Sequence, residues 1–173
     1  MRPDLAPMHV ARIKQLVRKG YYDSLNFHRV IEDFMAQGGD PMGNGSGGSG
    51  TNILAEFSKE KFVRGVVGMA RSQGKDSADS QFFIMLGDGR WLDDKYTVWG
   101  TVSAGMEFVD NIKIIDSSTV GTREYNPDSI VSMKIAADEA PAETTGKTPG
   151  KTPGKTTGKA GTTNAAATPA TAE

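Results

Sequence analysis

The chain has 173 residues, 24% of them charged, and a formal net charge of −1, and this length suits one domain with its own apolar core. The absence of cysteine excludes a disulfide framework, a thiolate nucleophile and a cysteine-based zinc site, and two widely separated histidines predict no metal site. The near-neutral charge gives no basic stripe for a nucleic acid, and no apolar run approaches the ~20 residues of a membrane helix.

The first element that the sequence predicts is an amphipathic helix. Val10, Ile13 and Val17 lie at helical spacing. Pro7 stands near the start of this stripe and Gly20 stands at its end. Proline is tolerated in the first turn of a helix and glycine favours its end, so the sequence marks both boundaries.

Six later segments are predicted to be strands, because apolar residues alternate with polar ones or dominate in them. They are residues 25–31, 34–37, 65–72, 80–86, 96–102 and 130–136. In the segment 80–86, alternation places Phe83 and Met85 on one face and Phe82 and Ile84 on the other. Both faces are largely apolar, which predicts a central strand.

A second helix and a tail complete the organisation. Met106, Val109 and Ile112 predict a helix of about three turns. Strands therefore dominate, which fits a mainly β fold, a barrel capped at its ends. Beyond residue 137 the composition changes to Thr, Gly, Lys, Ala and Pro, which cannot offset the ordering entropy by burial. We thus predict one domain over residues 1–137 and a disordered tail over 138–173.

The glycine-rich run of residues 38–50, GGDPMGNGSGGSG, contains the G-x-G-x-x-G pattern of dinucleotide-binding loops. That pattern has meaning only between a strand and a helix whose N-terminus faces the pyrophosphate. Here the run leads into TNILAEF, which shows no helical periodicity. We therefore interpret the run as a flexible loop beside the functional groove.

Residues 27–40, reading FHRVIEDFMAQGGD, place one arginine among phenylalanines, a methionine and a glutamine, with no nucleophile nearby. Such a mixture suits a reaction in which no bond is cleaved. The segment resembles the signature of the cyclophilin family of peptidyl-prolyl cis/trans isomerases, and residues 68–84 (GMARSQGKDSADSQFFI) and 91–100 (WLDDKYTVWG) resemble other motifs of that family. The resemblance implies an enzyme that isomerises Xaa-Pro bonds in peptides and unfolded proteins and needs no cofactor.

The resemblance also implies the fold, an eight-stranded antiparallel β-barrel capped by two helices. Family members begin with a strand hairpin ahead of the segment that matches residues 2–7, so this chain is expected to lack the N-terminal one to two strands. Such a gap reflects either a start placed at an internal methionine or a true truncation. The chain opens without a leader, which favours a cytoplasmic protein unless a leader was lost with the same residues. We expect a monomer.

Arg29 is the residue that the resemblance implies as the principal catalytic group. It shares a strand face with Phe27 and Ile31, where a charge is out of place unless it lines a groove. Rotation about an Xaa-Pro bond has a barrier of ~18–20 kcal/mol, because amide resonance must be broken. The prolyl nitrogen regains a lone pair as the bond twists, so a guanidinium that donates to it stabilises the twisted state. Phe34 and Gln37 are the other implied catalytic residues.

Eight further residues are implied in substrate binding, namely Met35, Ala70, Arg71, Gln81, Phe83, Trp91, Leu92 and Tyr96. Three of them, Met35, Phe83 and Leu92, form the implied apolar pocket for the proline ring together with Phe34. Trp91 matches the indole that is associated with cyclosporin binding in the family, so cyclosporin is an expected ligand.

Several polar positions supplement this pocket. Ala70 and Arg71 match the strand that pairs with substrate backbone, and Arg71 replaces the asparagine of many members, so its side chain adds a charge. Gln37 and Gln81 lie inside otherwise apolar strands, where an unpaired amide is costly. We expect them to hold Arg29 or a substrate carbonyl group.

The two histidines bear on whether the chain is instead a hydrolase, which would need a serine or threonine held by a histidine and an acid. His28 lies on the opposite strand face from Arg29 and is interpreted as a hydrogen-bonded structural residue rather than a general base. His9 is expected on the exposed part of the first helix. Tyr96 stands where many family members have histidine, which leaves the substrate preference open.

Two alternatives to the isomerase remain at this point. A proline-segment binding or chaperone module with little catalysis is favoured if the missing strands or the turn at Glu32 and Asp33 misplace Arg29. Alternatively, the chain is an incomplete product whose function belongs to a longer form. The joint presence of Arg29, Phe34 and Gln37 favours the enzyme.

Overall fold

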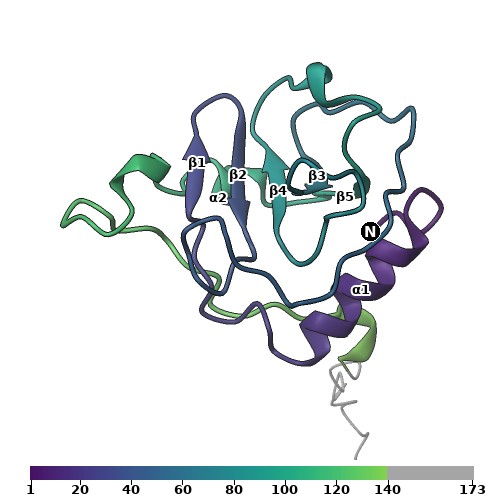
Figure 1. Cartoon of the computed structure of the whole chain (residues 1–173), viewed down its shortest axis with the longest axis horizontal. Helices are drawn as coiled ribbons and strands as arrows, with labels where there is room; N and C mark the ends of the chain where they lie inside the picture. Colours follow the sequence, from purple (N-terminus) through teal and green to yellow (C-terminus); the bar gives the residue numbers. More distant parts are fainter. Residues whose placement is uncertain (140–173) are drawn as a thin grey trace, which may run out of the picture. The chain divides into compact units, whose positions relative to one another are not determined.

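The computed structural model describes residues 1–139 (Figure 1). In chain order its elements, with η for a 3₁₀ helix, are α1 (Pro7–Arg18), β1 (Arg29–Ile31), β2 (Met35–Gly38), β3 (Val66–Met69), β4 (Phe82–Met85), η1 (Arg90–Leu92), β5 (Val98–Thr101), α2 (Met106–Val109), η2 (Ser117–Thr119) and η3 (Ala136–Asp138). The mainly β class with two α-helices is therefore confirmed. None of the helices in this part of the chain has the length and apolar character needed to cross a membrane. The predicted tail lies outside the described residues apart from its first two positions.

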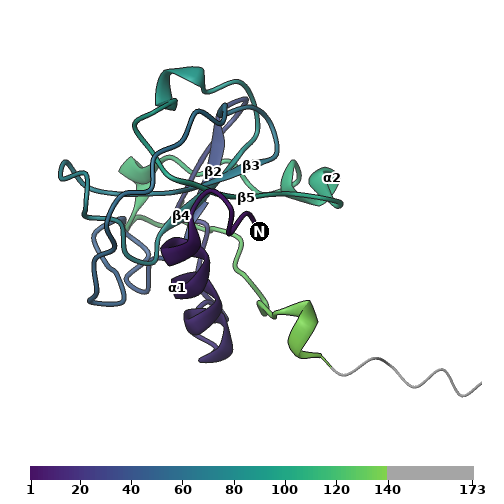
Figure 2. The ribbon, with the colours of Figure 1, turned by 90° about the vertical axis from the view of Figure 1, so that its right-hand side faces the viewer.

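The strands form one antiparallel sheet in the order β1-β2-β4-β3-β5. Within residues 1–139 this five-stranded sheet does not close into a barrel (Figures 1 and 2). The register sets Arg29 opposite Gln37, Gln37 opposite Phe83, and Phe83 opposite Gly68. Directly opposed residues share a sheet face, so this row of residues crosses four strands on one face.

The two faces of β4 bury different side chains, as the alternation predicts. Phe82 belongs to the main core, which contains the buried face of α1, and its ring meets Tyr22 and Trp99 edge to face at 5.6 and 6.1 Å. Phe83 and Met85 belong to a second cluster on the other face. The sheet thus separates a core that includes the buried face of α1 from a smaller apolar cluster.

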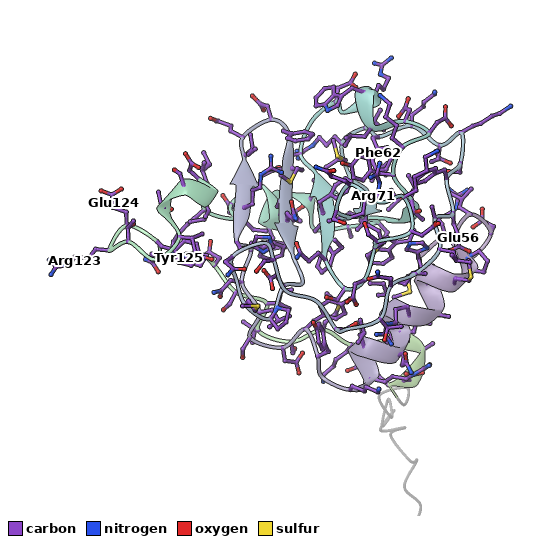
Figure 3. All side chains as sticks on the ribbon, viewed as in Figure 1. Glu56, Phe62, Arg71, Arg123, Glu124 and Tyr125 are labelled. Carbon is purple, nitrogen blue, oxygen red and sulfur yellow. The ribbon has the colours of Figure 1, made fainter. Side chains whose placement is uncertain are left out.

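Helix α1 is confirmed, but the expected exposure of His9 is wrong, because this side chain is fully buried. Its Nδ1 lies 2.6 Å from Oε2 of Glu56, which also accepts the backbone N–H of His9. The other carboxylate oxygen accepts the backbone N–H of Met8 at 3.0 Å. Ala6 at the N-cap offers no side-chain acceptor, so Glu56 from a distant loop satisfies the first turn (Figure 3).

Most of the predicted elements are shorter than expected, and one is absent. The predicted second helix is a single turn, α2, after which Asn111 and Ile112 donate to carbonyl oxygens three residues back. The predicted strand 130–136 is wrong, because the only pairing nearby is an isolated bridge at the preceding Ser129, and the segment ends in η3. The strands predicted over residues 25–31, 65–72, 80–86 and 96–102 are present but shorter, as β1, β3, β4 and β5. Alternation of apolar and polar residues does not by itself form a strand, because a strand also needs a neighbouring strand to pair with.

Acid should destabilise the fold through the buried His9 and Glu56 pair. Burial lowers the pKa of His9, although Glu56 partly offsets this effect. Burial alone would raise the pKa of Glu56, but the hydrogen bonds from His9 and Met8 outweigh it, and the pKa is lowered. Both groups bind fewer protons in the folded chain than in the unfolded chain. Stability is therefore lost as the pH falls below about 6.5 for His9 and below about 4.3 for Glu56.

We expect urea titrations followed by tryptophan fluorescence to show a lower free energy of unfolding at about pH 5.5 than at about pH 7.5. The decrease should be smaller in His9→Asn, which keeps a donor for Glu56 but does not titrate. His28 should supply the remainder, because burial lowers its pKa in the same direction. Equal decreases in the parent and in His9→Asn would show that His9 is not a titrating group.

Candidate active site

The row of opposed residues forms the floor of a pocket. Arg29 comes from the edge strand β1, Gln37 from β2 and Phe83 from the central strand β4. Gly68 on β3 leaves room for the aromatic rings, because a Cβ at this position would lie 2.5 Å from Phe83 Cζ and 2.6 Å from Phe62 Cε1. Glycine at position 68 therefore allows Phe83 to lie flat across the neighbouring strand.

The pocket has a volume of about 170 Å³ and an apolar character with two cations in its wall. It is lined by Arg29, Phe34, Met35, Gln37, Ala70, Arg71, Phe83, Leu92 and Tyr96. The structure thus brings together nine of the residues that the sequence singles out. Trp91 lies at the rim, 57% exposed, with its ring 5.2 Å from that of Phe34. Gln81 lies behind Gln37 and contacts it rather than this pocket.

A chain of hydrogen bonds positions the guanidinium of Arg29. Its Nη1 donates to Oε1 of Gln37 over a long 3.4 Å, and Nε2 of Gln37 donates to Oε1 of Gln81 at 2.9 Å. Nε2 of Gln81 in turn donates to the carbonyl oxygens of Gly45 and Gly47 at 3.0 and 2.8 Å. Each amide both accepts and donates, so the direction of the whole chain is set. Both glutamines are half-buried and paired, and Gln37 contacts Arg29 whereas Gln81 contacts Gln37 and the loop.

Arg29 keeps its full positive charge in this arrangement. Within residues 1–139 it forms no ion pair, whereas Arg18, Arg64 and Arg90 are each bonded to an aspartate. Its hydrogen-bond partner Gln37 is neutral, so the amide fixes the side chain without cancelling its charge. The pocket lining also contains no serine, threonine, cysteine or histidine. This site therefore offers a fixed cation in apolar surroundings, without the serine, cysteine or histidine of a hydrolase.

Phe62 is a residue of the site that sequence reasoning missed. It is fully buried in the loop before β3, and its ring lies 5.6 Å from Phe83 and 6.5 Å from Tyr96. Phe83 and Tyr96 are themselves 5.9 Å apart, edge to face. The three rings form a rigid wall at the back of the pocket. No periodicity marks Phe62, because it lies outside any helix or strand.

The glycine-rich loop is ordered by a carboxylate rather than open to a phosphate. Asp40 is 1% exposed, and its side chain accepts the backbone N–H groups of Met42, Asn44 and Gly45 at 2.8, 3.1 and 2.6 Å. Burial alone would raise the pKa of Asp40, but these hydrogen bonds outweigh it and lower the pKa. A dinucleotide loop would present such N–H groups to its ligand. Here these N–H groups already donate to Asp40, which agrees with the sequence-based rejection of a dinucleotide-binding loop.

Beside the first pocket lies a larger, more polar hollow of about 320 Å³. It shares Gln37, Ala70 and Arg71 with the first pocket, and the glycine-rich loop forms its opposite wall. The carboxylate of Asp79 in this wall is held by the hydroxyl of Ser49 and by backbone N–H groups of the loop. The two hollows are therefore parts of one cleft, divided by Gln37, Ala70 and Arg71.

Neither histidine takes part in a catalytic triad. His28 is 2% exposed and does not line the pocket. This burial agrees with a structural role for His28, although neither ring nitrogen forms a well-aligned hydrogen bond in the part of the chain that the structure describes. Burial lowers the pKa of His28, and its ring lies close to Gly45 of the glycine-rich loop rather than in the pocket. The hydrolase alternative therefore has no general base here.

Comparisons with known proteins agree with this geometry. The profile of the cyclophilin type peptidyl-prolyl cis-trans isomerase/CLD family matches residues 1–135. A protein from Brucella suis described as a probable peptidyl-prolyl cis-trans isomerase is 53% identical over 150 residues, covering 80% of this chain and 76% of the relative. A Dictyostelium discoideum peptidyl-prolyl cis-trans isomerase is 42% identical over 118 residues, which cover 65% of this chain and 75% of the relative.

Solved structures agree as well. A cyclophilin from Hirschia baltica has a TM-score of 0.69 and 28% identity, covering 80% of this chain and 69% of its own. A cyclophilin type peptidyl-prolyl cis-trans isomerase from Cryptosporidium parvum was crystallised in the presence of the dipeptide Ala-Pro. It has a TM-score of 0.59 and 30% identity, and the match covers 63% of this chain and 75% of the Cryptosporidium chain. The chain therefore belongs to the family of cyclophilin-type peptidyl-prolyl cis-trans isomerases.

Proposed function

We propose that this chain accelerates rotation about Xaa-Pro bonds in peptides and unfolded proteins, with Arg29 stabilising the twisted imide. The observation that carries the proposal is an arginine without an ion pair within residues 1–139, in the wall of an apolar pocket of about 170 Å³ whose lining has no serine, threonine, cysteine or histidine. A charged donor that faces an apolar pocket suits a reaction in which charge appears on one atom and no bond is cleaved.

The chemistry follows from how the amide changes along the rotation. In the planar ground state the nitrogen lone pair is delocalised, and the barrier to rotation is ~18–20 kcal/mol. In the twisted state the prolyl nitrogen is pyramidal, carries its lone pair and has no hydrogen, so it accepts a hydrogen bond from Arg29. An interaction made only in the twisted state accelerates the reaction. Lowering the barrier by ~7 kcal/mol corresponds to about five powers of ten in rate.

The remaining lining residues have complementary proposed roles. Phe34, Met35, Phe83 and Leu92 hold the proline ring, because their side chains form the apolar part of the pocket. Gln37 positions the guanidinium of Arg29 through the hydrogen bond described above. The backbone of Ala70 and Arg71, at the edge between the two hollows, pairs with the substrate backbone. Trp91 at the rim and Tyr96 in the wall complete the substrate contacts.

The binding or chaperone module remains the alternative function. It is favoured if the missing strands or the turn at Glu32 and Asp33 misplace Arg29. That turn uses a left-handed Asp33 with φ of 54°, and Arg29 lies in the pocket wall beside Gln37. The placement therefore supports the enzyme over the module, and the exchange measurement below distinguishes the two.

Finer features implied by the resemblance are also proposals. They are an eight-stranded barrel of which the five-stranded sheet is part, a monomeric state, a cytoplasmic location and cyclosporin binding at Trp91. The exposed indole of Trp91 beside Phe34 supports the last of these, because it offers a flat apolar surface at the rim of the cleft.

Substitution of Arg29 tests the mechanism. We expect Arg29→Ala to slow the catalysed cis/trans exchange of an Ala-Pro peptide, followed by NMR, by about 10²–10³-fold, the usual loss for one preorganised donor. Arg29→Lys should retain part of the rate, because it keeps the charge but loses the planar fork. Arg123→Ala, a change on an exposed loop, should exchange the peptide at the parent rate. Full activity in Arg29→Ala would place catalysis elsewhere, and a parent that binds without accelerating exchange would favour the binding module.

Substitution of Asp40 tests the support of the cleft. In Asp40→Asn an amide NH₂ replaces one acceptor oxygen and faces backbone N–H donors, so we expect the free energy of unfolding to fall by about 2–3 kcal/mol. The KM for a prolyl peptide should rise, because the loop carbonyl groups that hold Gln81 lose their position. Asp88→Asn, on an exposed carboxylate, should leave both quantities close to those of the parent. Unchanged stability in Asp40→Asn would show that the loop does not depend on this charge.

A further inference from the structure

Arg71 occupies a fixed position on the border between the two hollows. Its Nε donates to the carbonyl oxygen of Lys95 at 3.1 Å, and its Nη1 donates to those of Ser72 and Gln73 at 2.9 and 3.2 Å. The guanidinium carbon lies 4.6 Å from the ring centre of Tyr96, so the cation also stacks on an aromatic face. These contacts fix the side chain over the cleft before any substrate binds (Figure 3).

None of these partners cancels the charge of Arg71. All three acceptors are neutral carbonyl oxygens, and Arg71 forms no ion pair among residues 1–139. Its Nη2 donates no hydrogen bond to any side chain or backbone group in the same range. Among the residues that line the two hollows, Asp79 is the only acid, and its carboxylate accepts hydrogen bonds from Ser49 and from loop N–H groups and forms no ion pair with Arg71. A free donor with a full positive charge therefore faces the cleft.

We propose that Arg71 makes this protein prefer prolyl segments that carry an aspartate or glutamate close to the proline. The inference rests on the proposed function, because it assumes that a proline ring enters the apolar pocket. Arg71 lines that pocket as well as the adjoining hollow, so a chain that crosses from one to the other passes its guanidinium. A carboxylate there gains a charge-assisted hydrogen bond to Nη2.

The expected preference is modest and has a physical limit. The site is partly open to solvent, so screening reduces the interaction to that of a favourable surface ion pair. Because Arg71 is already held in place, little side-chain entropy is lost when the pair forms. Together these effects predict about a fivefold preference at low salt. A purely structural role for Arg71, holding Ser72 and Lys95, would give no preference between charged and neutral peptides.

The test is a peptide series measured by NMR exchange. One proline is flanked by alanines, and glutamate or glutamine replaces one alanine at a time within three positions on either side. We expect at least one position where kcat/KM for the glutamate peptide is about five times that for the glutamine peptide at low salt. This ratio should approach one in Arg71→Gln and at high salt. It should persist in Arg123→Gln, which removes the same charge from a loop remote from the cleft (Figure 3).

Each outcome bears on the proposal. A ratio near one at every position in the parent overturns it, as does an equal ratio in Arg71→Gln. Each ratio compares two peptides on the same protein. A general loss of activity in the variant lowers kcat/KM for both peptides equally and therefore leaves the ratio unchanged. If Arg71→Gln does not fold, a salt-independent ratio in the parent overturns the proposal, since a charge interaction must be screened.

The test also separates this proposal from the proposed function. Acceleration of the glutamine peptides by the parent supports the isomerase whatever the charge preference is. If no peptide is accelerated, the isomerase proposal fails. Titration of the glutamate and glutamine peptides by NMR chemical shift then measures the same preference as a ratio of Kd values, and equal Kd values overturn the role of Arg71.

Discussion

The antiparallel register of β1, β2 and β4 is the constraint on which the rest of the site depends. It sets Arg29 opposite Gln37 and Gln37 opposite Phe83, so a cation, an amide and an aromatic ring lie in one row. Side chains alternate with a period of two, so a slip of one residue in β1 would turn the guanidinium toward the main core. An unpaired charge buried there is strongly unfavourable. The residue that is proposed to carry the chemistry therefore also helps to select the register.

The same register explains why the partner of Arg29 is an amide. A carboxylate at position 37 would pair with the guanidinium and cancel the charge that the twisted imide is proposed to use. Gln37 instead fixes the geometry and leaves the charge in place. Its own orientation depends on Gln81, which is held by two loop carbonyl groups. In apolar surroundings such a fixed dipole chain acts more strongly than it would in water, because it does not reorganise during the reaction.

The sequence was most informative where chemistry and periodicity coincide. Strand alternation predicted the two faces of β4, and the motifs supplied residues that the sheet places around one pocket. Features that depend on distant partners could not be predicted in this way. The burial of His9 depends on Glu56, which lies 47 residues away. The segment 130–136 alternates well but lacks a strand to pair with along most of its length. Phe62 carries no local signal, because only tertiary contacts give it a role.

The glycine-rich loop shows how one pattern can serve opposite electrostatic purposes. In a phosphate-binding loop, glycines let backbone N–H groups converge on an external anion. Here the chain supplies its own anion, because Asp40 receives three of these N–H groups. A Cβ at Gly47 would overlap the Asp40 carboxylate, so glycine is needed for this close approach. The backbone N–H of Gly45 points to Asp40. The carbonyl oxygens of Gly45 and Gly47 accept hydrogen bonds from Gln81. The loop therefore contributes acceptors to the cleft, and these anchor the hydrogen-bond chain that ends at Arg29.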